Sequence, residues 1–197
     1  MALIREEDIT EWDAIKRVLT EAFGQADEAV IVDALRAYAC LTLSLVAIEN
    51  DEIIGHIAFS FVEITSNSKD KHIVGLAPMG VLPAHQRQGV GSHLVKEGVE
   101  RCRKMGIDAI VVLGHPNYYA KFGFEPAHQF GLSCVYDAPP EVFRVLDLTG
   151  DTLAHISGVV RYSTAFGVVS CAFNCLTIIL GKIVTEVNFY DFDVIEV

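Results

Sequence analysis

Apolar residues recur at helical spacing in two segments near the start of the chain, residues 12–23 and residues 30–38. An apolar stripe with a period of about 3.6 residues is typical of an amphipathic helix, so each segment predicts one. Residues 2–5, which precede them, predict a short strand. Thr10 and Asp13 predict the cap of the first helix, because a hydroxyl followed three residues later by an acid can satisfy free backbone N–H groups.

Two β-prone segments follow these helices. Residues 43–49 and 52–64 are rich in β-branched and aromatic side chains, and they flank Asn50 and Asp51. Asparagine and aspartate favour tight turns, so the two segments predict a β-hairpin. The polar run at residues 65–71 predicts a loop after the hairpin.

The next stretch predicts a strand, a helix and a second strand. Residues 72–82 are β-prone, although Pro78 lies inside them. Proline cannot donate a hydrogen bond to a neighbouring strand, so a bulge or an unpaired edge is expected there. Residues 89–105 carry a helical apolar stripe that ends at Gly106. Residues 108–113 form an apolar run, which indicates a strand buried on both faces and a helical crossover between neighbouring strands.

Weaker patterns follow these elements. Residues 116–122 predict a short helix that ends at Gly123, and residues 132–136 and 142–148 predict two further strands. Strands and helices in this order predict an α/β (α+β) fold, in which helices flank a mixed central sheet.

The length of 197 residues is enough for one large domain. We expect this domain at residues 1–166 and an extension of unknown role at residues 167–197. The extension is apolar and β-prone, and it would promote aggregation if exposed, so we expect it to pack on the domain or to form a homodimer. Its uncharged run at residues 168–180 is 13 residues long. This is short of the roughly 20 residues that span a bilayer.

Composition and charge exclude several classes of function. The chain is 51% hydrophobic and 21% charged, which predicts a folded protein. Its 15 basic and 26 acidic residues give a net charge of −11, which would repel the phosphates of a nucleic acid. We expect no metal site, because the cysteines form no C-x-x-C pair and His85 and His93 have no third ligand at a suitable spacing. The acidic start lacks the features of a signal peptide, so a cytoplasmic location is expected.

A glycine-containing turn links the predicted strand at 72–82 to the predicted helix at 89–105. Gly89 and Gly91 lie at this turn. The first N–H groups of a helix have no partner within the helix and attract anions, and glycine lets a phosphate approach the backbone. The turn therefore predicts a phosphate site. It does not match the dinucleotide fingerprint, because Leu94 stands where the third glycine belongs, and the chain has no P-loop motif.

This turn resembles the R/Q-x-x-G-x-G/A loop of the GCN5-related N-acetyltransferase (GNAT) superfamily. The loop runs from Gln86 to Gly91, after a segment at 79–83 that is similar to the family's strand ending in V-x-P. The segment at 113–124 resembles the family's Y-x-x-x-G-F signature. The likeness extends over roughly residues 3–162 and is strongest to bacterial predicted N-acetyltransferases.

The resemblance implies that the chain binds acetyl-coenzyme A between two splayed parallel strands. A bulge at Pro78 would open the gap that the cosubstrate fills. The strand residues implied to pair with the pantetheine arm are Met79, Gly80 and Val81. The residues implied to hold the pyrophosphate are Gln86, Arg87, Gln88, Gly89, Val90, Gly91 and Ser92.

Tyr119 matches the tyrosine that many members of this family use to protonate the departing thiolate. A phenol with a pKa of about 10 suits a general acid. Tyr118 is expected to pack the short helix. The general base stays open, because the strand before the loop contains no acid; Glu63, His72, His56 and a water relay are the alternatives.

The resulting prediction is an enzyme that transfers acetyl from acetyl-coenzyme A to a primary amine by direct attack. The alternative is a non-catalytic acyl-coenzyme A sensor or interaction module on the same scaffold. The sequence leaves the acceptor open among a small polyamine, an aminoglycoside-like compound, an amino acid and a protein N-terminus.

Overall fold

The computed structural model describes residues 2–65 and 71–168. The helices are α1 (Trp12–Phe23), α2 (Asp27–Ala37), α3 (Val90–Lys104) and α4 (Pro116–Ala120). The strands are β1 (Leu3–Glu6), β2 (Leu41–Glu49), β3 (Glu52–Thr65), β4 (Ile73–Val81), β5 (Ala109–Leu113), β6 (Glu125–Pro126), β7 (Leu132–Cys134), β8 (Phe143–Asp147) and β9 (Gly158–Tyr162). Short 3-10 turns include η1 (Ile9–Glu11) and η5 (Thr164–Phe166).

The strands form one mixed sheet in the order β1-β2-β3-β4-β5-β8-β6. Neighbours along this order are antiparallel except for β4 and β5, which run parallel and are joined through α3. β9 pairs with the end of β3, and β7 pairs in parallel with β9. The predicted mixed sheet with flanking helices is therefore confirmed.

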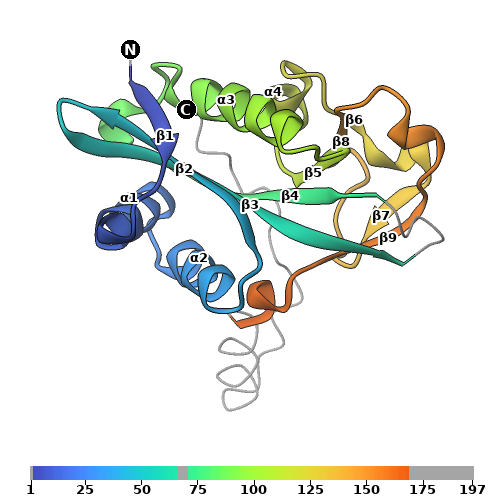
Figure 1. Ribbon diagram of the computed structural model, residues 1–197, viewed down its shortest axis with the longest axis horizontal. Helices are drawn as coiled ribbons and strands as arrows, with labels where there is room; N and C mark the ends of the chain where they lie inside the picture. Colours follow the sequence, from blue (N-terminus) through green and yellow to red (C-terminus); the bar gives the residue numbers. More distant parts are fainter. Residues whose placement is uncertain (1, 66–70, 169–197) are drawn as a thin grey trace.

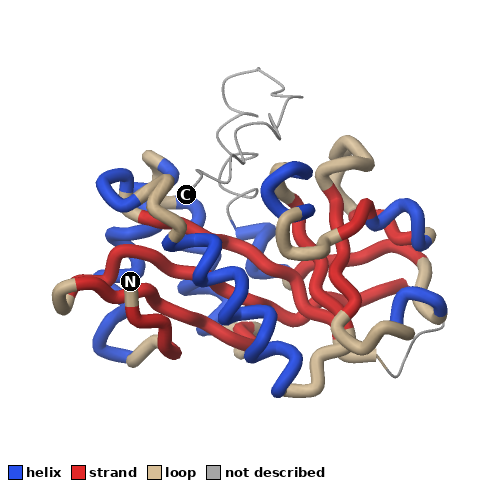
Figure 2. Tube along the Cα trace, turned by 90° about the horizontal axis from the view of Figure 1, so that it is seen from above, coloured by secondary structure: helices blue, strands red, loops and turns tan. Residues whose placement is uncertain are grey.

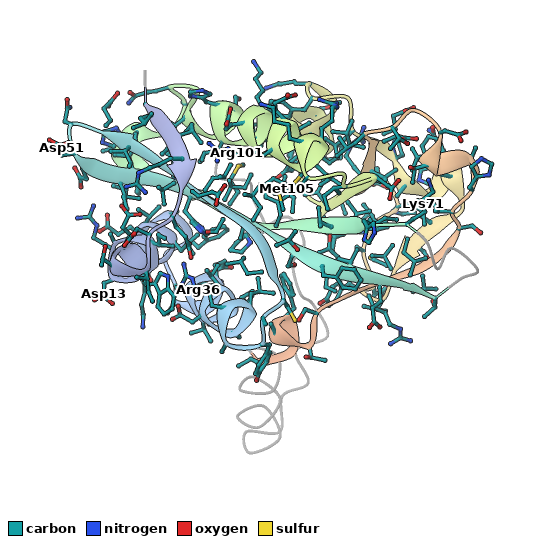
Figure 3. The ribbon with its side chains drawn as sticks, in the orientation of Figure 1. Asp13, Arg36, Asp51, Lys71, Arg101 and Met105 are labelled. Atoms are coloured by element: carbon teal, nitrogen blue, oxygen red, sulfur yellow. The ribbon has the colours of Figure 1, made fainter. Side chains whose placement is uncertain are left out.

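Helices cover both faces of this sheet (Figure 1). α3 and α4 lie on one face, and α1, α2 and η5 lie on the other. Figure 2 shows α3 lying across the strands, with β6–β9 gathered at one end of the molecule. Arg36 on α2 and Arg101 on α3 mark the two opposite faces in Figure 3. Apolar side chains between the helices and the sheet form the core.

Two local predictions from the sequence are confirmed. Asn50 and Asp51 join β2 to β3, and both have positive φ angles, 50° and 63°, as a tight hairpin turn of this kind requires. The predicted bulge at Pro78 is present as well. Ile57 pairs with Met79, whereas Phe59 pairs with Leu76, so β4 carries one more residue than β3 between these pairs.

Other predictions were wrong or lie outside the description. The cap before α1 is formed by Asp8 and Glu11 at η1, and not by Thr10 and Asp13. β9 was not predicted. Nearly all of the proposed extension, residues 169–197, lies outside the described residues. Within the described part of the chain, no helix is long and apolar enough to cross a membrane.

A buried polar network ties four segments together on the α1/α2 face. Arg36 of α2 donates to both carboxylate oxygens of Glu7, at 2.8 and 2.7 Å. Ser44 of β2 donates to Glu7 and lies 2.8 Å from Nε2 of His56 on β3. Burial by itself would raise the pKa of Glu7. The hydrogen bonds with His56, Arg36 and Ser44 outweigh this effect and lower the pKa far below its usual value. Glu7 therefore stays ionised and holds α2 against the sheet.

Glu7→Gln is expected to lower the free energy of unfolding by about 2–4 kcal/mol at pH 7, because the buried Arg36 loses its buried counter-charge and keeps only Asp33, which is about half exposed. Folding depresses the pKa of Glu7, so its contribution is present above the unfolded pKa of about 4.5 and is lost as the pH falls below it. Urea unfolding at pH 7 and at pH 3.5 should show a smaller difference from the wild type at the lower pH.

Glu52→Gln is the matched control. Glu52 pairs with Arg17, and both side chains are about half exposed. An exposed pair of this kind contributes less than about 1 kcal/mol. Equal losses in the two variants would show that the network around Glu7 does not hold α2 as described.

Candidate functional site

β4 and β5 pair for only a short distance and then separate. Their parallel register covers Ile73, Val74 and Gly75 of β4, which pair with Ala109, Ile110 and Val111 of β5. Beyond Gly75 comes the bulge at Pro78. The following half of β4 still pairs with β3, but among the described residues no strand pairs with its other edge, the one that faces β5. The two strands therefore enclose a gap that opens toward the end of β4.

The backbone of β4 presents hydrogen-bonding groups to this gap. Leu82 donates its N–H to the Ile54 carbonyl of β3, at 2.9 Å. In a trans peptide the neighbouring carbonyl, that of Val81, points the opposite way, and backbone groups alternate between the two edges of a strand. Val81 and Met79 therefore face the gap, whereas Gly80 faces β3. Of the three strand residues predicted to bind the cosubstrate, Met79 and Val81 present their backbone groups to the gap.

The predicted phosphate loop lies between β4 and α3. Gly89 caps the start of α3 with a φ of 84°, and a Cβ added there would meet no other atom within 4 Å. Val90, Gly91 and Ser92 form the first turn of α3, whose N–H groups have no acceptor within the helix. The start of this helix is open to an anion.

The side chains of the loop are partly used to hold it in place. Gln86 donates to the Val81 carbonyl at 3.0 Å, and Gln88 donates to the Ala84 carbonyl at 2.9 Å. Arg87 is exposed and has a φ of 59°. The sequence predicted all three as phosphate-binding residues, and in the structure the two glutamines also fix the loop to the end of β4.

Tyr119 of α4 packs against the residue that follows β5. A Cβ on Gly114, the residue after β5, would lie 2.4 Å from Cε2 of Tyr119, so the ring occupies the space that the missing side chain leaves. The ring packs edge-on against Tyr118 and Phe124. Burial raises the pKa of Tyr119 far above that of a free phenol. The phenol therefore keeps its proton at neutral pH.

The three side chains considered as a base lie in different surroundings. Glu63 and His72 are exposed. His56 is fully buried opposite Gly80 of β4, and its Nδ1 has no hydrogen-bond partner among the described residues. Burial lowers the pKa of His56, so the ring is neutral at pH 7. Of the three, His56 is the one that pairs with the half of β4 beyond the bulge.

Sequence reasoning missed three buried polar groups on the α1/α2 face. They are Glu28 of α2, Ser60 of β3 and Tyr162 of β9, each with a side-chain oxygen that has no partner in the described structure. Burial raises the pKa of Glu28. An acid such as Glu28 near the start of a predicted helix is a signal from which a buried polar group could have been found. The position of Tyr162 could not be found in this way, because Tyr162 lies on β9, a strand that the sequence did not predict.

The arrangement suits an extended molecule with an anionic end. Such a molecule would place its hydrogen-bonding chain along β4, its anion at the start of α3 and its reactive end beside Tyr119. The described residues contain no cluster of three His, Cys, Asp or Glu side chains that could hold a metal ion.

Comparison with known proteins agrees with this arrangement. Residues 3–127 match the acetyltransferase (GNAT) domain family. The chain is 36% identical over 165 residues to the uncharacterized N-acetyltransferase YhbS of Escherichia coli K12. The aligned residues cover 83% of this chain and 98% of that protein. The chain is 38% identical over 130 residues to the uncharacterized N-acetyltransferase YjhQ of the same organism, covering 64% and 72% of the two chains.

Two solved structures share the fold and more than a third of the aligned residues. The crystal structure of Escherichia coli YhbS in complex with coenzyme A has a TM-score of 0.80 and 36% identity, and the match covers 84% of this chain and 92% of that one. A GNAT acetyltransferase from Brucella melitensis in complex with acetyl-coenzyme A has a TM-score of 0.70 and 37% identity, covering 84% and 98%.

Gly89→Val is expected to weaken binding of coenzyme A by about 30-fold or more, because loss of two phosphate contacts corresponds to roughly 2–4 kcal/mol. Isothermal titration with coenzyme A measures the effect. Valine is also strained at a positive φ, so a loss of stability accompanies the loss of affinity.

Gly106→Val separates these two effects. Gly106 follows the other end of α3, has a φ of 77° and is likewise open around a Cβ. Gly106→Val should destabilise the protein about as much as Gly89→Val does, and it should leave the affinity for coenzyme A unchanged. A Gly89→Val variant that binds coenzyme A as tightly as Gly106→Val does would place the phosphate site elsewhere.

Proposed function

Since this chain belongs to the GNAT family of acetyltransferases, we propose that it transfers the acetyl group of acetyl-coenzyme A to a primary amine. The observation that carries this proposal is the separation of β4 from β5 beyond Gly75, with the open start of α3 at the end of the same strand. The complexes of YhbS with coenzyme A and of the Brucella melitensis protein with acetyl-coenzyme A support the choice of cosubstrate.

The cosubstrate fits the groups that face the gap. The backbone of Met79 and Val81 is suited to the amides of the pantetheine arm. The N–H groups from Gln86 to Ser92 are suited to the pyrophosphate, because a helix start carries a partial positive charge. In this position the thioester would lie between the diverging strands, near Tyr119.

The transfer forms one bond and breaks one. The lone pair of the neutral amine attacks the thioester carbonyl carbon, the C–N bond forms, and the C–S bond breaks with its electron pair passing to sulfur. Tyr119 gives its proton to this sulfur, and the surplus proton on nitrogen passes to a base or to water. The products are the N-acetylated amine and coenzyme A with a free thiol, and Tyr119 regains a proton from water.

Tyr119 is the proposed general acid. Its place on α4 beside the residue that follows β5 supports this role, and its raised pKa keeps the phenol protonated whenever the amine is neutral enough to attack. For the proton on nitrogen, the α1/α2 face offers two buried groups with an unpartnered atom, His56 and Glu28. Both are compatible with a base, since His56 is neutral at pH 7 and a raised pKa makes the Glu28 carboxylate more basic.

Tyr119→Phe should lower kcat by about 10²–10⁴-fold, the range of general acid catalysis, while the affinity for acetyl-coenzyme A stays nearly unchanged. Release of free thiol at saturating amine measures the first quantity, and isothermal titration measures the second. Tyr118→Phe is the control and should lose little. Turnover equal to the wild type in Tyr119→Phe would remove this phenol from the mechanism.

A thiol-release screen over a panel of primary amines tests the function itself. An acetyltransferase releases coenzyme A in proportion to acetylated amine with at least one member of the panel. A protein that binds acetyl-coenzyme A by titration and releases no thiol with any amine would instead be an acyl-coenzyme A sensor.

A further inference from the structure

Tyr162 places a second phenol at the point where β4 and β5 separate. A Cβ on Gly75 would lie 2.4 Å from Cε1 of Tyr162, so the ring lies directly on the backbone of Gly75. Gly75 is the last residue of β4 that pairs with β5. A glycine thus holds each phenol beside the gap, Gly75 for Tyr162 and Gly114 for Tyr119.

The two phenols approach the gap from opposite faces of the sheet. Val111 of β5 packs in the same core cluster as Tyr162, whereas its neighbour Val112 packs in the cluster that contains Tyr119. Successive side chains of a strand point to opposite faces. Burial raises the pKa of Tyr162, and Tyr119 adds to this rise. A group that reacts in the gap would have one phenol on each side.

The hydroxyl of Tyr162 is buried and has no hydrogen-bond partner among the described residues. Ser60 of β3 has a buried hydroxyl in the same condition. Ser60 is the cross-strand partner of Gly75, so the two unpartnered hydroxyls belong to the same level of the sheet. A buried polar atom without a partner is unfavourable and rare in folded proteins. Two at one level, beside a reaction site, indicate a ligand that supplies their hydrogen bonds.

Two aromatic rings pack against Tyr162. Phe166 and Tyr136 lie with their ring centroids 5.2 and 6.0 Å from that of Tyr162. Apart from burial, the groups that shift the pKa of Tyr162 are Cys134, Tyr136 and Tyr119, which are all neutral at pH 7. Aromatic faces accept apolar rings and a single ammonium group. A second cationic end would have no carboxylate partner among these groups.

We propose that Tyr162 and Ser60 bind the acceptor amine on the α1/α2 face, opposite Tyr119, and that the acceptor carries its amino group on an aromatic body. The inference rests on the proposed acetyl transfer. The two hydroxyl oxygens accept hydrogen bonds from the N–H groups of the amine, and they direct its lone pair toward the thioester carbonyl. The neighbouring rings contact the body of the acceptor.

Tyr162→Phe tests the proposal with 2-phenylethylamine as the probe. KM for this amine should rise at least 10-fold, while kcat and the affinity for acetyl-coenzyme A change less than threefold. Ser60→Ala should act in the same direction. Tyr38→Phe, which alters an exposed tyrosine just after α2, is the control and should change none of these quantities.

Urea unfolding separates a binding role from a structural one. Tyr162→Phe and Ser60→Ala remove unpartnered buried hydroxyls, so their unfolding midpoints should equal or exceed that of the wild type. A lower midpoint in both variants, or an unchanged KM in both, would overturn the proposal.

A pair of amines tests the substrate class. The wild-type kcat/KM for 2-phenylethylamine should exceed that for putrescine at least 10-fold, and a preference for putrescine would contradict the aromatic acceptor. Failure of the acetyl transfer looks different, since no amine would then release thiol although acetyl-coenzyme A binds. If 2-phenylethylamine releases thiol while Tyr162→Phe and Ser60→Ala both keep the wild-type KM, the transfer stands and only this inference fails.

Discussion

β4 can pair with β5 over only three residues, because an extra residue near Pro78 bends the strand away. Everything at the proposed site depends on this limit. It leaves the backbone of Met79 and Val81 without a strand partner on one edge, and it opens the gap that Tyr119 and Tyr162 approach. A regular β4 would complete the parallel ladder and leave no hydrogen-bonding edge for a cosubstrate.

The two faces of the sheet support the site in different ways. On the α3 face, the start of the helix offers backbone N–H groups, and the side chains of Gln86 and Gln88 hold the loop that precedes it. On the other face, the ion pair between Glu7 and Arg36 fixes α2 to the sheet. α2 is thus held by buried charge as well as by buried apolar side chains such as Ala29 and Val32.

The sequence predicted those parts of the site that have local causes. Pro78 alone indicated the bulge, and Gly89 with Gly91 indicated the open helix start, because each acts within a few residues of itself. Tyr162 and Ser60 could not be predicted in this way. They meet at Gly75 only because β9 pairs with the end of β3, about a hundred residues earlier in the chain. The cap at Asp8 and Glu11 was missed for a simpler reason, since a short 3-10 turn precedes α1.

The contacts of Gly75 with Tyr162 and of Gly114 with Tyr119 have a consequence for how the protein tolerates mutation. A single methyl group at either glycine would come within 2.4 Å of a phenol ring, so the ring would have to retreat by about 1 Å to restore van der Waals contact. Even alanine, the smallest replacement for glycine, is therefore severe at these two positions. Selection on the placement of the two phenols would appear in descendants of this sequence as two invariant glycines that touch no substrate.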